Sequence, residues 1–157
     1  MDKLARVQLA KIIEPPIQSS DLDVPLPPAL QNVRGYTEVT SSLEATAGFA
    51  EIGDYVLGKF DGLKEMSLPD KNKAEGRRQQ WIYYLNIPVD SNGEPVAGEK
   101  VAGWRRVGVW GSAILDRMMT EAVRRGLKES QSLMIQYVGD IDTDQPSPAK
   151  NFRVIYK

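Results

Sequence analysis

Trp104-Arg-Arg-Val-Gly-Val-Trp110 has the composition of a β-strand, and the residues that follow, Ser112-Ala-Ile-Leu-Asp-Arg-Met-Met-Thr-Glu-Ala-Val-Arg-Arg-Gly126, have that of a helix. Ser112 is a suitable N-cap, and apolar side chains recur behind it at helical spacing. Asp116 near the start and two arginines in the last turn suit the helix dipole, and Gly126 supplies a stop. We therefore expect a strand over about residues 100–110, followed directly by a helix over residues 113–125.

The neighbouring runs extend this pattern in both directions. Residues 55–63 and 78–89 are expected to be strands before it, and residues 133–138 and 151–156 strands after it. The order strand, strand, strand, helix, strand, strand is typical of a small, partly open barrel of the oligonucleotide/oligosaccharide-binding (OB) type. The prediction is a mainly β fold, a five-stranded OB-type barrel over residues 51–157 with one helix between its third and fourth strands.

Residues 1–50 are expected to form a proline-rich N-terminal extension. Residues 15–28 hold five prolines, which deny backbone donors and favour extended geometry. This arm is a candidate for self-association, so a homo-oligomer formed through it is one predicted assembly. The pattern of residues 1–14 suits a short helix or a strand equally, and residues 41–49 have helical character.

Composition excludes several classes of chemistry. The 157 residues include no cysteine and no histidine, which removes disulfides, thiolate or histidine catalysis and nearly every zinc site. A net charge of −1 argues against indiscriminate adhesion to nucleic acid but leaves room for a local basic groove. No apolar run is long enough for a transmembrane helix, and no export signal is visible, so we expect no membrane association and a cytoplasmic location.

Aromatic and cationic residues gather on the two middle strands. Bases stack on exposed rings with about 1–3 kcal/mol each, and phosphates seek cations, so this composition favours binding of single-stranded nucleic acid. Because strand neighbours point to opposite faces, only one arginine of each adjacent pair is expected to face a groove, and Trp104 is the preferred exposed ring. The alternative is that the rings fill the barrel and the charges are solvated. The candidate contact residues are Trp81, Tyr83, Tyr84, Trp104, Arg78, Arg105, Arg106, Lys71, Lys73 and Arg153.

The acidic loop that begins at Asp140 is the one candidate for a metal. It resembles the start of a calcium loop, but Gln145 and Asn151 stand where that loop needs glycine and glutamate. No phosphate-cradling Gly-Lys-Ser/Thr motif or dinucleotide fingerprint is present. We therefore predict no metal site, no cofactor and no enzymatic activity.

Residues 53–157 resemble the OB-fold single-stranded DNA-binding proteins, particularly the divergent kind encoded by phages and other mobile elements. The segments that carry the resemblance are residues 53–60, 109–115, 134–139 and 150–154. It implies sequence-independent binding of single-stranded DNA in replication or recombination, in the host cytoplasm if the protein is phage-encoded. The first rival is a structural or protein-interaction module, such as a virion or assembly component that uses the same barrel. The second is a metal-dependent nuclease.

Overall fold

The computed structural model describes residues 7–14, 27–31, 45–98, 100–142 and 148–157. Within them the fold is mainly β, with one α-helix placed between the third and fourth of the long strands, as predicted. The elements are β1 (Gln8–Leu9), β2 (Lys11–Ile13), the 3₁₀ helix η2 (Pro28–Leu30), β3 (Thr46–Gly48), β4 (Asp54–Pro69), β5 (Arg77–Val89), β6 (Gly103–Trp110), α1 (Ala113–Arg124), β7 (Ser132–Ile141) and β8 (Ala149–Tyr156).

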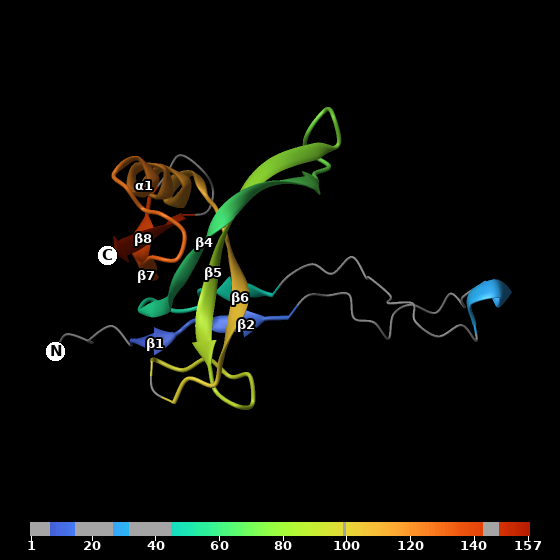
Figure 1. Cartoon of the computed structure of the whole chain (residues 1–157). Coiled ribbons are helices and arrows are strands. Elements are labelled where there is room, and N and C mark those ends of the chain that lie inside the picture. Colours follow the sequence, from blue (N-terminus) through green and yellow to red (C-terminus); the bar gives the residue numbers. More distant parts are fainter. Residues whose placement is uncertain (1–6, 15–26, 32–44, 99, 143–147) are drawn as a thin grey trace.

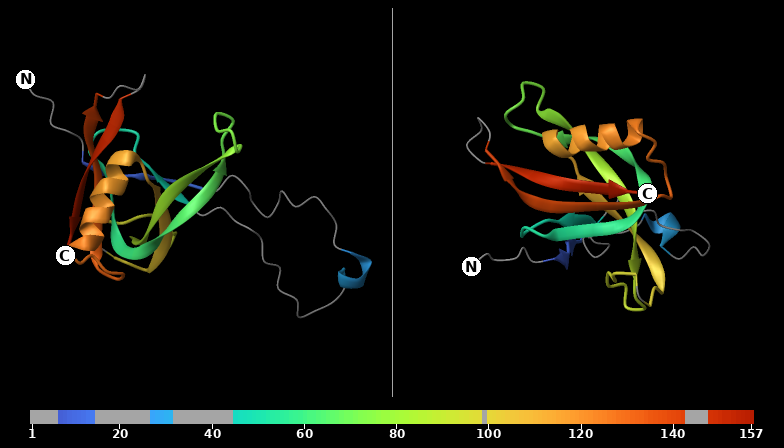
Figure 2. Two further views of the ribbon diagram at one scale, coloured as in Figure 1. Left: turned by 90° about the horizontal axis from the view of Figure 1, so that it is seen from above. Right: turned by 90° about the vertical axis from the view of Figure 1, so that its left-hand side faces the viewer.

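One curled sheet contains all eight strands of the described residues, in the order β2-β3-β6-β5-β4-β7-β8, with β1 paired to β4 (Figures 1 and 2). The curl depends on β4, whose first part pairs with β7 and whose second part pairs with β5. Two glycines lie at the bend. A Cβ on Gly58 would lie 2.4 Å from the carbonyl oxygen of Asn86, and Gly62 has a φ of +92° beside the bulge that follows Phe60. Beyond the bend, residues 63–69 and 77–83 project as a hairpin, at the upper right of Figure 1.

The residues expected to form an N-terminal arm supply three of the short strands. β1 runs parallel to β4, β2 pairs antiparallel with β3, and β3 meets β6 where Thr46 lies opposite Gly108. The sheet therefore has three strands beyond the expected five. The helical character expected for residues 41–49 is wrong at Thr46–Gly48, which is a strand because it pairs on both sides. Of the five prolines of residues 15–28, Pro15, Pro16 and Pro25 lie outside the described residues.

Asp54 anchors the start of β4 to this N-terminal part. Its carboxylate is buried and accepts hydrogen bonds from Gln8 Nε2 (2.6 Å) and from the backbone N–H groups of Ala50 (2.9 Å) and Glu51 (3.0 Å). A buried carboxylate is tolerated only when donors satisfy it. The three donors meet this requirement, and they hold β1 and residues 50–51 against the sheet.

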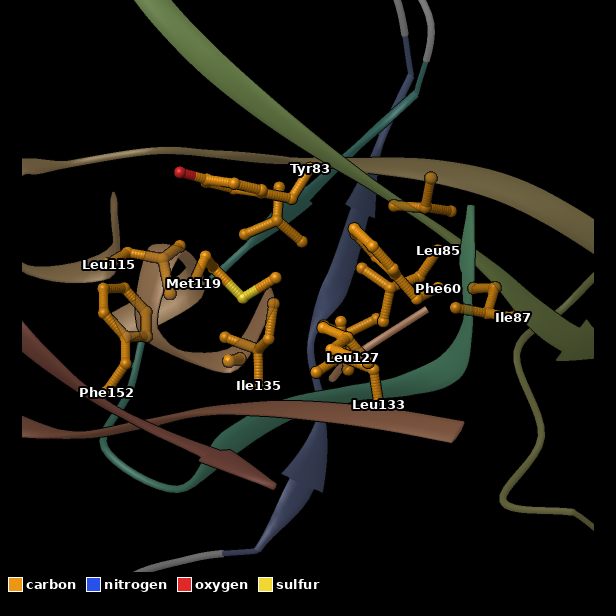
Figure 3. Packing of buried hydrophobic residues seen from close by; sticks show 14 of the residues in the cluster. Phe60, Tyr83, Leu85, Ile87, Leu115, Met119, Leu127, Leu133, Ile135 and Phe152 are labelled. Carbon is orange, nitrogen blue, oxygen red and sulfur yellow. The ribbon is translucent and has the colours of Figure 1, made fainter. Parts of the chain in front are cut away.

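The core lies between α1 and the inner face of the curled sheet. Leu115, Met119 and Ala122 form the buried face of the helix. Figure 3 shows Met119 pointing between Tyr83 of β5 and Ile135 of β7. The helix begins as expected, because the Ser112 hydroxyl accepts a hydrogen bond from Leu115 N at 3.2 Å.

Across the ranges that the structure describes, no helix has the length and apolar character needed to cross a bilayer.

Candidate nucleic-acid interface

The pairing register assigns each side chain of β5 and β6 to a face. Leu85 lies opposite Val107 and Tyr83 opposite Val109, and all four side chains are in the core. Because side chains alternate along a strand, the intervening pairs project from the other side of the sheet. We call this side the outer face, and its residues on β4, β5 and β6 are Lys59, Ile82, Tyr84, Asn86, Pro88, Trp104, Arg106, Gly108 and Trp110.

Trp104 is the most exposed ring of this face. Its side chain is 51% exposed, as expected for the preferred ring, and it lies opposite Pro88 near the start of β6. The ammonium Nζ of Lys59 lies 4.6 Å from the centroid of the ring. A cation over an indole face is attracted by the ring quadrupole and is well placed to meet an anion beside the ring. Trp104 and Lys59 thus bring a stacking surface and a positive charge to one point.

Tyr84 lies on the same face but is buried, at 5% exposure. The guanidinium of Arg106 covers its ring, with 3.7 Å between the guanidinium carbon and the ring centroid. Arg106 Nε also donates to Asp61 Oδ2 at 3.0 Å. A ligand that approaches this part of the face therefore meets Arg106, and the Tyr84 ring supports the arginine from below.

Arg105 points to the opposite side of β6 from Arg106, as alternation predicts. It donates two hydrogen bonds to the carboxylate of Glu14, at 2.7 and 2.6 Å, and these bonds lower the pKa of Glu14. Both arginines of the pair are thus engaged by carboxylates. Solvent-exposed ion pairs contribute only about 0–1 kcal/mol, because water and salt screen them, so a phosphate can compete for either guanidinium.

Tyr83 belongs to the core. Its hydroxyl donates to Asp116 Oδ1 of α1 at 2.6 Å, and burial together with this carboxylate raises the pKa of Tyr83. The bond ties the helix to the sheet, so the ring serves packing and is closed to a base. Trp81 has the same orientation along β5 but lies beyond the core, on the projecting hairpin, where it is opposite Glu65 and 37% exposed.

The hairpin also carries the expected cations. Arg78, Lys71 and Lys73 are exposed there, in β5 and in the turn that precedes it. The neighbouring Arg77 is held in place by bonds from its Nε to Ser67 Oγ (2.7 Å) and from its Nη2 to Ser67 O (2.8 Å). The hairpin therefore combines one partly exposed indole with several cations at its tip.

Arg153 lies away from the other candidates. It is on β8, which β4 and β7 separate from β5 in the sheet, and its Nη1 lies 3.4 Å from Gln136 Oε1. The structure therefore brings Trp104, Tyr84 and Arg106 together on the outer face. It places Trp81, Arg78, Lys71 and Lys73 on the hairpin, where alternation along β5 turns Arg78 to the opposite face from Trp81. The other three candidates lie outside both groups: Tyr83 is in the core, Arg105 is paired with Glu14 on the other side of β6, and Arg153 is on β8.

Lys59 and Asp61 are contacts of the site that sequence reasoning missed. Both are neighbours of the core residue Phe60 on one strand, so alternation alone would have placed their side chains on the opposite face of the sheet from Phe60. What the sequence lacks is the cross-strand register, which sets Lys59 opposite Asn86 and so beside β6.

The acidic Asp140 of the candidate metal loop accepts a hydrogen bond from the Tyr137 hydroxyl at 2.5 Å, and residues 143–147 of that loop lie outside the described residues.

Comparison with known proteins finds no counterpart: no family model, curated protein or solved structure gives a significant match to this chain.

Proposed function

We propose that the protein binds single-stranded DNA, without catalysis and largely without regard to sequence, in DNA replication or recombination. The observation that carries the proposal is the half-exposed Trp104 ring with the Lys59 ammonium 4.6 Å from its centroid, on the outer face of the middle strands. A base can stack on the indole while the ammonium attracts the adjoining phosphate. Arg106, next along β6, supplies a second cation on the same face.

The architecture supports this proposal. The order of β4, β5, β6, α1, β7 and β8 agrees with an OB-type barrel, in which the second and third strands and the loop between the first two form the binding groove. In this chain those parts are β5, β6 and the β4–β5 hairpin, where the exposed rings and cations lie. The proposal includes the OB identity, the likeness to phage or mobile-element proteins, and a cytoplasmic location.

Roles within the proposed site follow from exposure. Trp104 and Trp81 are the stacking rings, and Lys59, Arg106, Arg78, Lys71 and Lys73 hold phosphates. Tyr84 acts through Arg106, because the arginine covers its ring at 3.7 Å. Tyr83, in the core, has no contact with the ligand in this proposal.

The test is titration with oligo-dT at low salt, followed by tryptophan fluorescence and by the anisotropy of a labelled strand. Trp104→Ala removes the ring, so we expect the dissociation constant to rise about 5- to 150-fold, the equivalent of 1–3 kcal/mol. Trp104→Phe keeps a stacking ring but removes the indole emission of residue 104, so it should bind within a few-fold of wild type and lose the part of the quenching that Trp104 contributes, while that of Trp81 remains.

Val101→Ala is the matched control, because Val101 is also exposed, at 41%, just before β6. It should bind as wild type does. The absence of both quenching and anisotropy change in the wild-type protein would contradict the proposal.

The second candidate function is a structural or protein-interaction module. It is favoured by the two arginines that carboxylates already engage, Arg105 with Glu14 and Arg106 with Asp61. Under this reading the ion pairs stabilise the sheet and the outer face contacts protein. It predicts that oligo-dT binds no more tightly than a duplex of the same length and that Asp61→Asn, which removes the ion pair with Arg106, leaves the affinity for oligo-dT unchanged.

A further inference from the structure

β8 presents an open edge of the sheet. It is the last strand of the sheet order, and among the described residues its strand partner is β7 alone. Lys157 N donates to the carbonyl oxygen of Ser132, the first residue of β7. Because the backbone groups of an antiparallel strand point alternately toward and away from its partner, the N–H and C=O groups of Val154 and Tyr156 point away from β7. Phe152 N, the preceding outward donor, already bonds Asn151 Oδ1 at 3.0 Å. Two residues therefore offer backbone groups for a further strand.

An apolar groove lies beside this edge. Figure 2 shows α1 running beside β8, and the space between them has a volume of about 380 Å³. Met118 and Ala122 of the helix and Val154 and Tyr156 of the strand supply its apolar lining. A strand added to β8 would place every second side chain on the side of Val154 and Tyr156, and so in this groove. The edge and the groove thus suit the same ligand.

The other side of β8 continues an apolar row. The register sets Leu57 opposite Met134 and Met134 opposite Ile155, on the outer side of the sheet. Ile155 is 53% exposed and Leu57 is 38% exposed. Ile155 lies on this side between Arg153 and Lys157, so an added strand would meet one apolar side chain flanked by two cations.

The charge around the edge is positive. The segment of β8 and Lys157 contains no aspartate or glutamate. Its Lys150 lies opposite Asp140 of β7, whereas Arg153 lies opposite Gln136 and Lys157 beside Ser132, so the last two cations have no acidic residue across the ladder. Arg117 and Arg125 line the groove on the helix side. The acidic residue of that lining, Glu121, is bonded by Arg124 and Arg125. The surface therefore complements an acidic partner.

We propose that β8 binds an extended acidic segment of another protein as an additional antiparallel strand. Its alternate apolar side chains enter the groove between α1 and β8, and its acidic side chains lie on the side of Arg153 and Lys157. A second copy of this chain is a poor occupant. Antiparallel pairing of β8 with itself in the register that sets Ile155 opposite Ile155 would bring Arg153 of each copy against Lys157 of the other, and like charges across a ladder destabilise it.

The probe is a fluorescein-labelled peptide, Glu-Val-Glu-Val-Glu-Val-Glu, with blocked ends. We expect a saturable rise in anisotropy with the full chain, weakened by salt. Three control peptides separate the contributions of charge, of side-chain alternation and of backbone hydrogen bonds. Lysine in place of glutamate reverses the charge, Glu-Glu-Glu-Val-Val-Val-Glu breaks the alternation, and N-methylation of the valines removes the donors that would face β8. Each control should bind at least tenfold more weakly.

Two changes in the protein test the same surface. Val154→Pro deletes an outward N–H, a position at which an edge strand tolerates proline, and should weaken the probe at least tenfold. Arg153→Glu combined with Lys157→Glu should do the same by reversing the charge. The matched control is Lys71→Glu with Lys73→Glu, which changes the net charge equally on the distant hairpin and should leave peptide binding within twofold of wild type.

Three results would overturn the proposal: no binding of the alternating peptide, equal binding of the lysine or N-methylated peptide, or equal weakening by the hairpin control. Sedimentation velocity and titration with oligo-dT give two further results that would overturn it. A dimer that Val154→Pro dissolves would assign the edge to a second copy. Oligo-dT binding that is lost in the Arg153 and Lys157 double variant, but not in the hairpin control, would assign the surface to nucleic acid.

Discussion

The hydroxyl of Tyr137 shows how single side chains secure the far end of the sheet. The hydroxyl donates to Asp140 Oδ1 on the same strand. The centroid of the Tyr137 ring lies 6.2 Å from that of Phe152 of β8 and 4.8 Å from Lys150 Nζ. The bond to the carboxylate, with burial, raises the pKa of Tyr137 to about 12. The neutral phenol is therefore the form that the fold favours.

This shift predicts a loss of stability in alkali. A folded-state pKa above the unfolded value of about 10 gives stabilisation that is fully present below pH 10 and is lost as the pH rises through about 12. Comparison of wild type with Tyr137→Phe by phenolate absorbance should show the missing ionisation near pH 12. An ionisation near pH 10 in the folded protein would contradict the bond to Asp140.

At the scale of one element, the bend of β4 depends on the absence of a side chain at Gly58. A Cβ there would meet the Asn86 carbonyl oxygen at 2.4 Å and the Asn86 carbonyl carbon at 2.9 Å. Both are backbone atoms of β5, so the clash can be relieved only if one strand moves. The close approach of these strands is what allows β4 to leave β5 and join β7.

We therefore expect Gly58→Ala to destabilise the fold by about 1–3 kcal/mol, the typical cost of overpacking. Gly103→Ala is the matched control, because the nearest atom to its added Cβ is Val89 Cγ2 at 3.8 Å, an ordinary contact. Urea unfolding of both variants measures the difference. Equal midpoints would show that β4 bends without the close approach.

At the scale of the whole molecule, a net charge of −1 requires that any binding of DNA be local. The proposed site places cations on the outer face and at the hairpin tip, while Glu14 and Asp61 each hold an arginine. Each phosphate of a single strand that a protein cation neutralises releases condensed counterion. It contributes about −0.7 to the slope of log K against the logarithm of the salt concentration.

Replacing both Lys71 and Lys73 with alanine should therefore make this slope shallower by up to about 1.4, if each lysine neutralises one phosphate. Lys157→Ala is the control, because that residue adjoins β8, which β4 and β7 separate from β5. Its slope should equal that of wild type. A steeper or unchanged slope in the double variant would remove the hairpin from the site.

The order of the long strands and the position of α1 were predictable, because both depend on local signals. Ser112, the apolar spacing and Gly126 define the helix within the sequence itself, and the turn residues separate the strands. β1, β2 and β3 were not predictable in this way. They are two or three residues long. β1 and β3 are strands because β4 and β6 offer edges to them, and β2 is a strand because it pairs with β3.

The sequence by itself determined the mainly β class, the single helix, and the exclusion of histidine and cysteine chemistry, since composition and short-range spacing carry these. Only the tertiary structure decided which rings and cations meet. Trp104 and Tyr84 lie on the same face, yet one is exposed and the other covered by Arg106. Arg105 reaches Glu14, 91 residues away in the chain. Such contacts depend on strand register and on the curl of the sheet, which no local pattern encodes.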